Sequence, residues 1–387
     1  MSESTDWGLR IAMVGTRGVP ASYGGFETAV EEIGWRLAAR GHDVVVYCRR
    51  REKGAPKSYR GMTLVHLPSL RVKVLETLSH TGLSTLHILF HRKPNMAFVF
   101  NAANSPFLPI LKLSRVRSAV HVDGLEWKRG KWGSVGRRYY RRAEELCVRW
   151  ADALIADARG IADYYRDEFE VETELLTYGA PIIETSELDR LADLGLQKGK
   201  FHLVVARFEP ENNVDLILQG FISSSAQYPL VVVGSAPYAA AYSARIAGLA
   251  RDDDRVRLLG GIWDQAQLDA LYSHTRNYIH GHSVGGTNPS LLRAMGAGAA
   301  VVAWDVNFNR DVLGSGASFF SNAATLGHLI VEAERSDEYL VMGAALKKRA
   351  QAQYDWDLVT SGYEALARKL STSNFQRPAG RRRRLAS

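Results

Sequence analysis

The chain has only two cysteines among its 387 residues, Cys48 and Cys147. They lie far apart in the sequence and neither is part of a Cys-x-x-Cys pair, so nothing indicates a zinc site or a thiol-redox site. Long hydrophobic runs are also absent, since no segment approaches the ~18 apolar residues that a membrane span requires. The N-terminus is acidic and lacks the features of an export signal. We therefore expect a cytoplasmic protein, free or bound to the membrane surface.

The chain has fewer acidic than basic residues, 41 Asp and Glu against 49 Lys and Arg, which gives a net charge of +8. This excess indicates an anionic partner. Four of the positive charges, residues 381–384, lie in a basic C-terminal tail (373–387) that we expect to be disordered. The tail either reaches the anionic partner or affects solubility alone.

Short apolar runs alternate with amphipathic stretches, which is typical of βαβ units and a parallel sheet. The first series of expected strands covers residues 10–15, 42–48, 62–67, 96–101, 118–122, 153–158 and 173–176. A second series covers residues 201–206, 230–234, 255–259, 278–280 and 299–303. The predicted fold class is α/β, with two doubly wound, Rossmann-like domains at 1–190 and 191–355 facing a central cleft. A helix at 356–372 is expected to return to the first domain.

Ligands of doubly wound domains bind at the carboxyl ends of the strands, so the loops at those ends are the candidate sites. The first loop, residues 15–27, is rich in glycine and leads into a helix that we expect from about residue 26 to 40. Amides at a helix N-terminus favour anions. We assign Gly24 and Gly25 to donor binding and Glu27 to acceptor binding. An ordinary strand-to-helix turn is the alternative.

The second loop follows the first strand of the second series and begins with Arg207. A guanidinium at a strand end can neutralise a diphosphate, because its planar fork donates to two oxygens at once. A surface ion pair with Glu209 or Glu211 is the alternative.

The third loop, residues 280–293, is the most informative. Thr287 or Asn288 is expected to cap a helix, with Pro289 in the first helical position. The amides of the first turn and of the preceding Gly-Gly pair can then hold phosphate oxygens. His282 can donate to a phosphate or to a sugar hydroxyl, or be structural. The predicted donor-binding set in this loop is His282, Gly285, Gly286, Thr287, Asn288, Ser290, Leu291 and Arg293.

The fourth loop follows the strand at 118–122 and carries Asp123 and Glu126. A carboxylate beside a glycine at a strand end suits binding of sugar hydroxyls or removal of a proton from an acceptor hydroxyl. Helix capping is the alternative for Asp123. We assign Asp123 a catalytic role and expect acceptor binding by Glu126, Trp127, Lys128 and Arg129.

Together the four loops resemble those of glycosyltransferase family 4, and more narrowly the capsule-type rhamnosyltransferases. Members of that group share a Gly-Thr-Arg-Gly-Val-Pro…Tyr-Gly-Gly-Phe-Glu loop, Asp-Gly-Leu-Glu-Trp-Lys-Arg, Pro-Glu-Asn-Asn and Gly-Gly-Thr-Asn-Pro, and all four occur here in order. The resemblance spans residues 11 to about 370.

The resemblance implies a GT-B fold, transfer with retention of anomeric configuration, and no cofactor or obligatory metal. It also implies dTDP-L-rhamnose as the nucleotide-sugar donor and a polyprenyl-diphosphate-linked saccharide as the acceptor, in surface polysaccharide biosynthesis. By position, Arg207 should contact the donor diphosphate and is predicted to be catalytic with Asp123.

Three positions depart from the wider family. Asn212, which we also assign to donor binding, stands where a lysine is usual, which weakens or removes one phosphate contact. Gly285 and Arg293 replace two glutamates, the second of which would bind the ribose hydroxyls. Arg293 is either tolerated with a deoxynucleotide, or adds a phosphate contact, or marks a weakened enzyme.

Two segments favour peripheral contact with an anionic membrane on the inner face of the plasma membrane. Residues 127–142 interleave seven Lys or Arg with four aromatic residues. Residues 72–90 place Val74, Leu75, Leu78, Leu86 and Leu89 at near-helical spacing. These leucines face either a membrane or the protein core.

Competing functions are a GT-B sugar-nucleotide epimerase, a non-catalytic sugar-nucleotide-binding protein, and a nucleic-acid-binding protein. The last is disfavoured, because no exposed sheet with stacking aromatics is expected. The Asp252-Asp253-Asp254 run is interpreted as a polar turn and not as a metal site, so no metal ligands are predicted.

Overall fold

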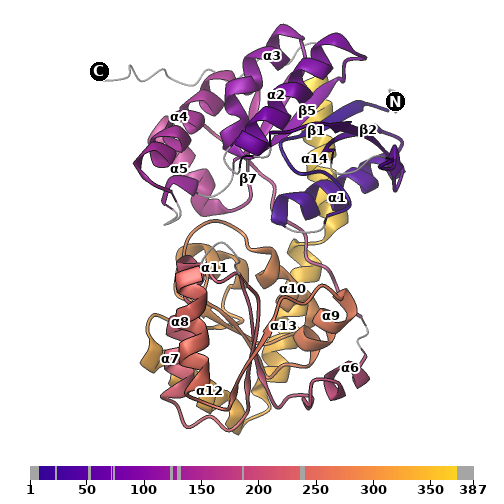
Figure 1. The fold of residues 1–387 in the computed structure, drawn as a ribbon. Helices are drawn as coiled ribbons and strands as arrows, with labels where there is room; N and C mark the ends of the chain where they lie inside the picture. The colour runs from indigo at the N-terminus through magenta and orange to yellow at the C-terminus, as the bar shows by residue number, and fades with distance from the viewer. Residues whose placement is uncertain are drawn as a thin grey trace. The chain divides into compact units, whose positions relative to one another are not determined.

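The computed structural model describes residues 8–21, 24–50, 54–70, 72, 75–122, 125–128, 132–184, 187–235 and 240–372. The chain forms two compact units. Unit 1 comprises Met1–Tyr178 and Trp356–Ser387, and unit 2 comprises Gly179–Asp355. Each unit is an α/β layer structure (Figure 1).

The described residues of unit 1 contain a sheet in the order β3-β4-β2-β1-β5-β6-β7-β8. All neighbours pair in parallel except β3 and β4. The strands are β1 (Arg10–Val14), β2 (Asp43–Arg49), β3 (Ser58–Tyr59), β4 (Met62–Leu67), β5 (Met96–Phe100), β6 (Arg117–Val122), β7 (Ala153–Ala156) and β8 (Glu174–Leu175).

Helices cover both faces of this sheet. The helical segments are α1 (Gly25–Ala39), α2 (Leu75–Phe90), α3 (Leu108–Leu113), α4 (Ser134–Trp150), α5 (Arg159–Phe169), α14 (Trp356–Ser371), and the 3₁₀ turns η1 (Ala102–Phe107) and η2 (Glu126–Lys128). Helix α1 contacts α14, whereas α2, α3, α4 and η1 contact one another. Strands buried on both faces must be apolar throughout, and Ile11 to Val14 in β1 are all fully buried.

Unit 2 has a parallel sheet in the order β11-β10-β9-β12-β13-β14 within the described residues. Its strands are β9 (His202–Val205), β10 (Leu230–Val233), β11 (Val256–Gly260), β12 (Asn277–His280), β13 (Val301–Trp304) and β14 (Ser318–Phe320). Helices α7, α8 and α12 contact one another, as do α9, α10 and α13 (Figure 1). The helical segments are α6 (Asp189–Ala192), η3 (Pro210–Asn212), α7 (Val214–Ile222), α8 (Ala240–Arg251), α9 (Gln265–His274), α10 (Pro289–Ala297), α11 (Asn307–Leu313), α12 (Ala323–Arg335) and α13 (Glu338–Gln353).

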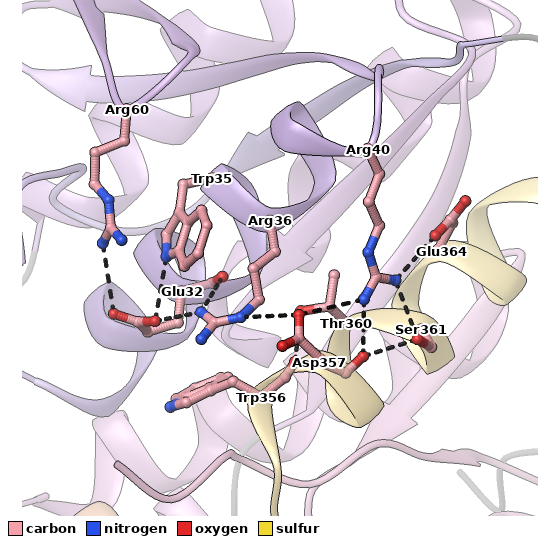
Figure 2. Close-up of polar contacts among 10 residues, drawn as sticks. All are labelled: Glu32, Trp35, Arg36, Arg40, Arg60, Trp356, Asp357, Thr360, Ser361 and Glu364. Atoms are coloured by element: carbon pink, nitrogen blue, oxygen red, sulfur yellow. Dashed lines mark hydrogen bonds and ion pairs between the residues drawn. The ribbon is translucent and has the colours of Figure 1, made fainter. Parts of the chain in front are cut away.

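Helix α14 belongs to unit 1 although it follows unit 2 in the chain. A polar network joins it to α1 (Figure 2). Arg40 contacts Glu364 at 3.0 Å and donates to the backbone oxygen of Asp357 at 3.0 Å. Arg36 pairs with the Asp357 carboxylate at 3.3 Å. On the same helix Tyr363 is fully buried against Phe98 of β5.

The strands expected in both series are present, with each end within two residues of its expected position, and the predicted fold class is confirmed. The two strands that were not expected, β3 and β14, are two and three residues long, too short to show an apolar periodicity. The predicted boundary at residue 190 falls in α6, whereas the units divide between Tyr178 and Gly179. Among the described helices, none has the length and apolar character needed to cross a bilayer.

Candidate functional site

The site in unit 2 lies where the sheet order reverses. Strand β9 is flanked by β10, the next strand in the chain, and by β12, which follows after a crossover. In open α/β sheets this switch point, at the carboxyl ends of the strands, is where ligands bind. The loop with Arg207 follows β9, and the loop after residue 280 follows β12, so two of the predicted loops emerge side by side.

Arg207, Asn212 and His282 form a connected group. Asn212 Nδ2 donates to the backbone oxygen of Arg207 at 2.8 Å, and this contact fixes which end of the amide is which. The remaining amide oxygen, Oδ1, lies 2.8 Å from Nδ1 of His282. Because a carbonyl oxygen only accepts, Nδ1 of His282 carries a proton. Neutral His282 therefore has its acceptor nitrogen at Nε2.

Arg207 keeps 39% of its side chain exposed and pairs with Glu209 at 3.5 Å. The ion pair that was the alternative for this residue is therefore present, and the guanidinium also retains access to solvent. Both side-chain groups of Asn212 are occupied by protein contacts, and the residue is buried. Asn212 therefore positions Arg207 and His282 and is not itself placed to bind phosphate, contrary to its assignment to the donor-binding set.

The backbones of the two loops touch directly. Ser283 donates its N–H to the Glu211 oxygen at 2.9 Å, and Asn213 Nδ2 donates to the Gly281 oxygen at 2.7 Å. A Cβ at Gly281 would lie 2.2 Å from the backbone oxygen of Asn212, so only glycine permits this close approach of the two loops. The two loops therefore form one rigid element.

Helix α10 begins as its sequence predicts. Asn288 is the N-cap, and its side-chain oxygen accepts from the Ser290 N–H at 2.9 Å, with Pro289 in the first helical position. Gly285, with a φ of 133°, and Gly286 precede the cap on the same loop. Backbone amides of this turn are the groups that can meet an anion.

The side chains of the remaining predicted donor-binding residues in this turn point into the unit. Ser290 Oγ lies 3.0 Å from the Tyr272 hydroxyl and donates to the Val205 oxygen at 3.3 Å. Leu291 and Thr287 are buried. Whatever these three residues contribute to a ligand therefore comes from the backbone.

Arg293 is held by a carboxylate of the neighbouring helix. Its Nη1 forms a very short contact with Oδ1 of Asp269 on α9, and about a quarter of each side chain is exposed. The pair joins α9 to α10 and neutralises much of the arginine's charge. This ion pair was not among the roles predicted for Arg293, and those roles stay predictions.

In unit 1, the loop between β1 and α1 is held by two glutamates one helical turn apart. Glu27 accepts from the Arg17 N–H at 3.2 Å, and Glu31 accepts from the Ala21 N–H at 2.6 Å. Gly24 is the N-cap of α1, and the helix starts at Gly25. Glu27 therefore already has a backbone partner in its own loop, in addition to its predicted acceptor role.

The fourth loop is described only in part. Asp123 and Arg129 and the side chain of Lys128 lie outside the described residues. Glu126 is buried and accepts from the Trp132 indole at 3.0 Å. The Trp127 ring lies under the Arg141 guanidinium, 4.9 Å from its centroid. Glu126 and Trp127 thus attach η2 to the residues around α4.

A buried carboxyl that the sequence did not single out lies beside Trp127. Glu144 of α4 accepts from the Tyr164 hydroxyl at 2.9 Å. Burial raises the pKa of Glu144 to about 7, although hydrogen bonds from Tyr164 and Trp127 and the charge of Arg141 oppose the shift. This carboxyl therefore changes charge near neutral pH, at the base of the fourth loop.

Other site residues were also missed. Asn309 of α11 is buried and donates to the His282 oxygen at 3.0 Å and to the Trp304 oxygen at 2.9 Å. Asn213 has a positive φ of 50° at the start of α7. Asn213 lies between η3 and α7 and Asn309 lies within α11, and an asparagine at such a position is a weak signal in a single sequence. Only the tertiary contact shows what it holds.

Two features bear on metal binding and charge. In the described part of the chain no three His, Cys, Asp or Glu side chains gather in a way that could hold a metal ion. Asp253 instead closes a turn by accepting from the Arg255 N–H at 2.9 Å. At the end of β12, burial lowers the pKa of His280 to about 3, so His280 is neutral at physiological pH.

Comparison with known families and proteins gives two family matches. Residues 190–340 match the family described as Glycosyl transferases group 1. Residues 96–181 match a domain of unknown function, DUF1972. No curated protein matches the chain.

Solved structures share the fold over nearly the whole chain. Sucrose-phosphate synthase from Thermosynechococcus elongatus has a TM-score of 0.80 at 19% identity, over 94% of this chain and 99% of that one. Anabaena Alr3699/HepE in complex with UDP-glucose has a TM-score of 0.74 at 14% identity, over 93% and 100%. An E. coli trehalose-6-phosphate structure bound with UDP-2-fluoro glucose has a TM-score of 0.71 at 11% identity, over 93% and 99%. These findings support a glycosyltransferase of GT-B architecture, with a match to the glycosyl transferases group 1 family over residues 190–340.

Proposed function

We propose that this chain is a retaining glycosyltransferase that moves a sugar from a nucleotide diphosphate to a lipid-diphosphate-linked saccharide. The donor is dTDP-L-rhamnose and the acceptor carries a polyprenyl diphosphate. The observation that carries the proposal is the meeting of the Arg207 loop and the α10 N-terminus at the switch point of the glycosyl transferases group 1 domain. The similar Anabaena and E. coli structures hold UDP-sugars, which supports a nucleotide-sugar donor.

On this proposal the donor diphosphate is held by charge and by backbone amides. Arg207 supplies a partly exposed cation, and the residues before α10 supply N–H groups at a helix N-terminus. When the sugar leaves, negative charge grows on the diphosphate, and donors fixed in advance stabilise that charge. The departing diphosphate then takes the proton of the acceptor hydroxyl. No cofactor and no metal ion takes part.

His282 has a more specific role than phosphate binding. The hydrogen bond from its Nδ1 to Asn212 places the acceptor lone pair of the neutral ring on Nε2. Neutral His282 therefore accepts from a sugar hydroxyl, whereas protonated His282 would donate to a phosphate. We propose that it orients the donor sugar.

The acceptor side is proposed for unit 1, with Asp123 as the group that orients the sugar or acceptor and with Glu27, Trp127, Lys128 and Arg129 near the acceptor. Arg141, stacked on Trp127, adds a cation beside this loop. An acceptor anchored in a bilayer requires the enzyme at the membrane surface. We therefore propose peripheral contact with the inner face of the plasma membrane.

The test is a transfer assay with purified protein, a panel of dTDP- and UDP-sugars and a lipid-diphosphate saccharide, with and without EDTA. Release of nucleotide and the mass of the glycolipid are followed together. We expect acceptor-dependent release from dTDP-rhamnose that EDTA leaves unchanged. Arg207→Ala should lower kcat/KM by about 10²- to 10³-fold, the range seen when one charge-stabilising donor is removed.

Arg335→Ala is the matched control. Arg335 is exposed in the last turn of α12. That turn contacts Arg276, which precedes β12 at the amino-terminal ends of the strands, away from the Arg207 loop. An Arg207→Ala protein with the turnover of the Arg335→Ala protein would refute the role of Arg207. Conversion of the donor without an acceptor would instead indicate an epimerase.

A second candidate, a non-catalytic sugar-nucleotide-binding protein, is favoured by the Arg293–Asp269 pair. In the wider family that the sequence resembles, a glutamate at this position would bind the ribose hydroxyls. Substituting Arg293→Glu alone would place two carboxylates together, so the informative variant is Arg293→Glu with Asp269→Arg. If the native chain binds donors without turnover and this double variant turns them over, the non-catalytic function holds for the native chain.

A further inference from the structure

Helix α2 exposes apolar side chains and buries mostly polar ones. At 100° per residue, its four exposed apolar residues fall within an arc of about 80°: Leu75, Leu83, Leu86 and Phe90. The opposite side, which is buried, is mostly polar: His80, Thr81, Ser84, Thr85 and Ile88. A helix of a water-soluble domain normally has the reverse arrangement.

Two hydroxyl groups on the buried side bond to the backbone of α2 itself. Ser84 Oγ donates to the His80 oxygen at 2.8 Å, and Thr85 Oγ1 donates to the Gly82 oxygen at 2.9 Å. Burial lowers the pKa of His80 to about 4, so the ring is neutral at physiological pH. Among its large apolar side chains the helix therefore buries only Ile88 fully, and Leu78 and Leu89 are half-buried. The exposure of the other four is not a by-product of packing and requires its own explanation.

The neighbouring helix α3 also exposes an apolar side chain. Phe90, at the end of α2, is 77% exposed, and Leu113, at the end of α3, is 73% exposed. The two helices pack side by side in unit 1 (Figure 1). We call Leu75, Leu83, Leu86, Phe90 and Leu113 the apolar stripe. Isolated exposed apolar residues are common, but a row of them marks an interaction surface.

The charge around the apolar stripe has a single sign. From residue 53 to residue 122 the chain has ten Lys and Arg but only one Asp or Glu, Glu76. Glu76 pairs with Arg49 at 3.0 Å. Four of the cations are exposed and lie in the last turn of α3 or just after the ends of α2 and α3: Arg92, Lys93, Lys112 and Arg115.

We propose that the apolar stripe and these four cations dock unit 1 onto the surface of an anionic lipid bilayer. Apolar side chains in the interface flanked by Lys and Arg are the arrangement that binds anionic membranes, each cation near the surface adding to the attraction. A protein partner of matching polarity would need a uniformly acidic rim around an apolar groove, whereas anionic lipid provides both parts at once. The proposal does not depend on the transferase function.

The chain offers a clean labelling experiment. Both native cysteines are buried, so a cysteine introduced by Phe90→Cys can be labelled selectively with an environment-sensitive fluorophore. The full-length protein is mixed with vesicles of phosphatidylcholine alone or with phosphatidylglycerol added. We expect a blue shift and a rise in emission with the anionic vesicles only, lost in high salt. The same label introduced by Val341→Cys, at an exposed apolar position in unit 2, should not respond.

Vesicle co-sedimentation of unlabelled variants separates the apolar contribution from the charge contribution. Phe90→Ser with Leu113→Ser should weaken binding about tenfold or more, because apolar area no longer enters the interface. Arg92→Glu with Lys93→Glu should abolish the preference for anionic lipid. All four side chains are exposed, so both proteins should fold, and their melting curves check this. Leu340→Ser with Val341→Ser is the control.

Unchanged binding in both double variants would overturn the proposal. So would a concentration-dependent dimer that Phe90→Ser dissociates and that vesicles do not affect, because the apolar stripe would then bind a second copy of the chain. Neither measurement uses a sugar donor or acceptor. Failure of vesicle binding would therefore remove the proposed membrane contact but leave the proposed transfer reaction standing, and a failed transfer assay would leave the membrane proposal standing.

Discussion

At the scale of single residues, Asn212 is a neutral positioning group where a lysine would bring positive charge. A lysine here would bring a second cation to the diphosphate, but the buried amide instead bonds the Arg207 backbone and the His282 ring at once. Each contact uses one end of the same planar group, so the two partners are fixed relative to each other. The site therefore relies on Arg207 for charge and on Asn212 for geometry.

Asn212→Ala should destabilise unit 2 by about 1–3 kcal/mol, because it leaves two buried polar groups without their partner. It should also release the tautomer of His282. The measurements are chemical denaturation and the ¹⁵N shifts of the His282 ring, which should show protonated Nδ1 in the native protein only. Gln351→Ala, at an exposed position of α13, is the control. An unchanged tautomer in Asn212→Ala would contradict the assigned hydrogen bond.

Glu144 should make unit 1 less stable as the pH rises. Its pKa is raised from 4.5 to about 7, with burial as the main cause, so the folded state keeps a proton that the unfolded state has lost. Stability should therefore fall between pH 4.5 and 7, by an amount on the order of 3 kcal/mol. Glu144→Gln should remove this part of the pH dependence.

Glu145→Gln is the matched control, since the neighbouring Glu145 is about one third exposed and pairs with Arg142. Denaturation curves from pH 4.5 to 8 compare the two variants. If they show the same pH dependence, Glu144 does not titrate as its burial requires.

At the scale of elements, α14 depends on an ion network for its attachment to α1. Glu364 receives hydrogen bonds from Arg368, Arg40 and His42. The His42 ring accepts from the Leu9 N–H at Nδ1, so its Nε2 carries the proton that it donates to Glu364. Burial alone would raise the pKa of Glu364, but these three donors outweigh it and lower the pKa to about 2.

Glu364→Gln should therefore destabilise unit 1 at neutral pH by roughly 2–3 kcal/mol. The stabilisation from the carboxylate is fully present above the unfolded pKa of 4.5 and disappears as the pH falls toward 2. The difference between native and variant proteins in denaturation should thus shrink in acid. Asp163→Asn, in an exposed pair with Arg166, should change little at any pH. A constant difference across this range would exclude the ion network as its cause.

At the scale of the whole molecule, the two units have separate sheets and separate cores. Apart from Gly24 and Gly25 of unit 1, the groups proposed to hold the donor lie in Gly179–Asp355. A nucleoside diphosphate that binds these groups should therefore stabilise unit 2 directly. The cleft between the units stays a prediction.

Addition of dTDP at one hundred times its Kd should stabilise unit 2 by about 2.7 kcal/mol. Hydrogen exchange should slow in residues 207–213 and 281–293, while the core of β1 to β8 in unit 1 should exchange as before. EDTA should not alter the effect. Protection confined to unit 1 would place the nucleotide site elsewhere than proposed.

The architecture was predictable because central strands such as β1, β5 and β10 are buried on both faces and therefore appear as apolar runs. Asn288 and Pro289 likewise predict the start of α10, because capping and first-turn preferences depend on neighbouring residues alone. The partners of Arg293 and Glu144 were not predictable. Asp269 lies 24 residues before Arg293, and Tyr164 lies 20 residues after Glu144. Nothing in a single sequence connects such pairs.

Sequence alone thus determined the two α/β units, the start of α10 and the order of the candidate loops, since these follow from periodicity and local backbone preference. Tertiary structure decided which polar groups meet: Asn212 bonds to His282, and Arg293 pairs with Asp269. It also decided that α2 has leucines on its exposed side. The residues at 72–90 were compatible with a helix facing either the core or a membrane. Only the packing of α2 against the rest of unit 1 selects the face that is buried, because burial depends on contacts far apart in the chain.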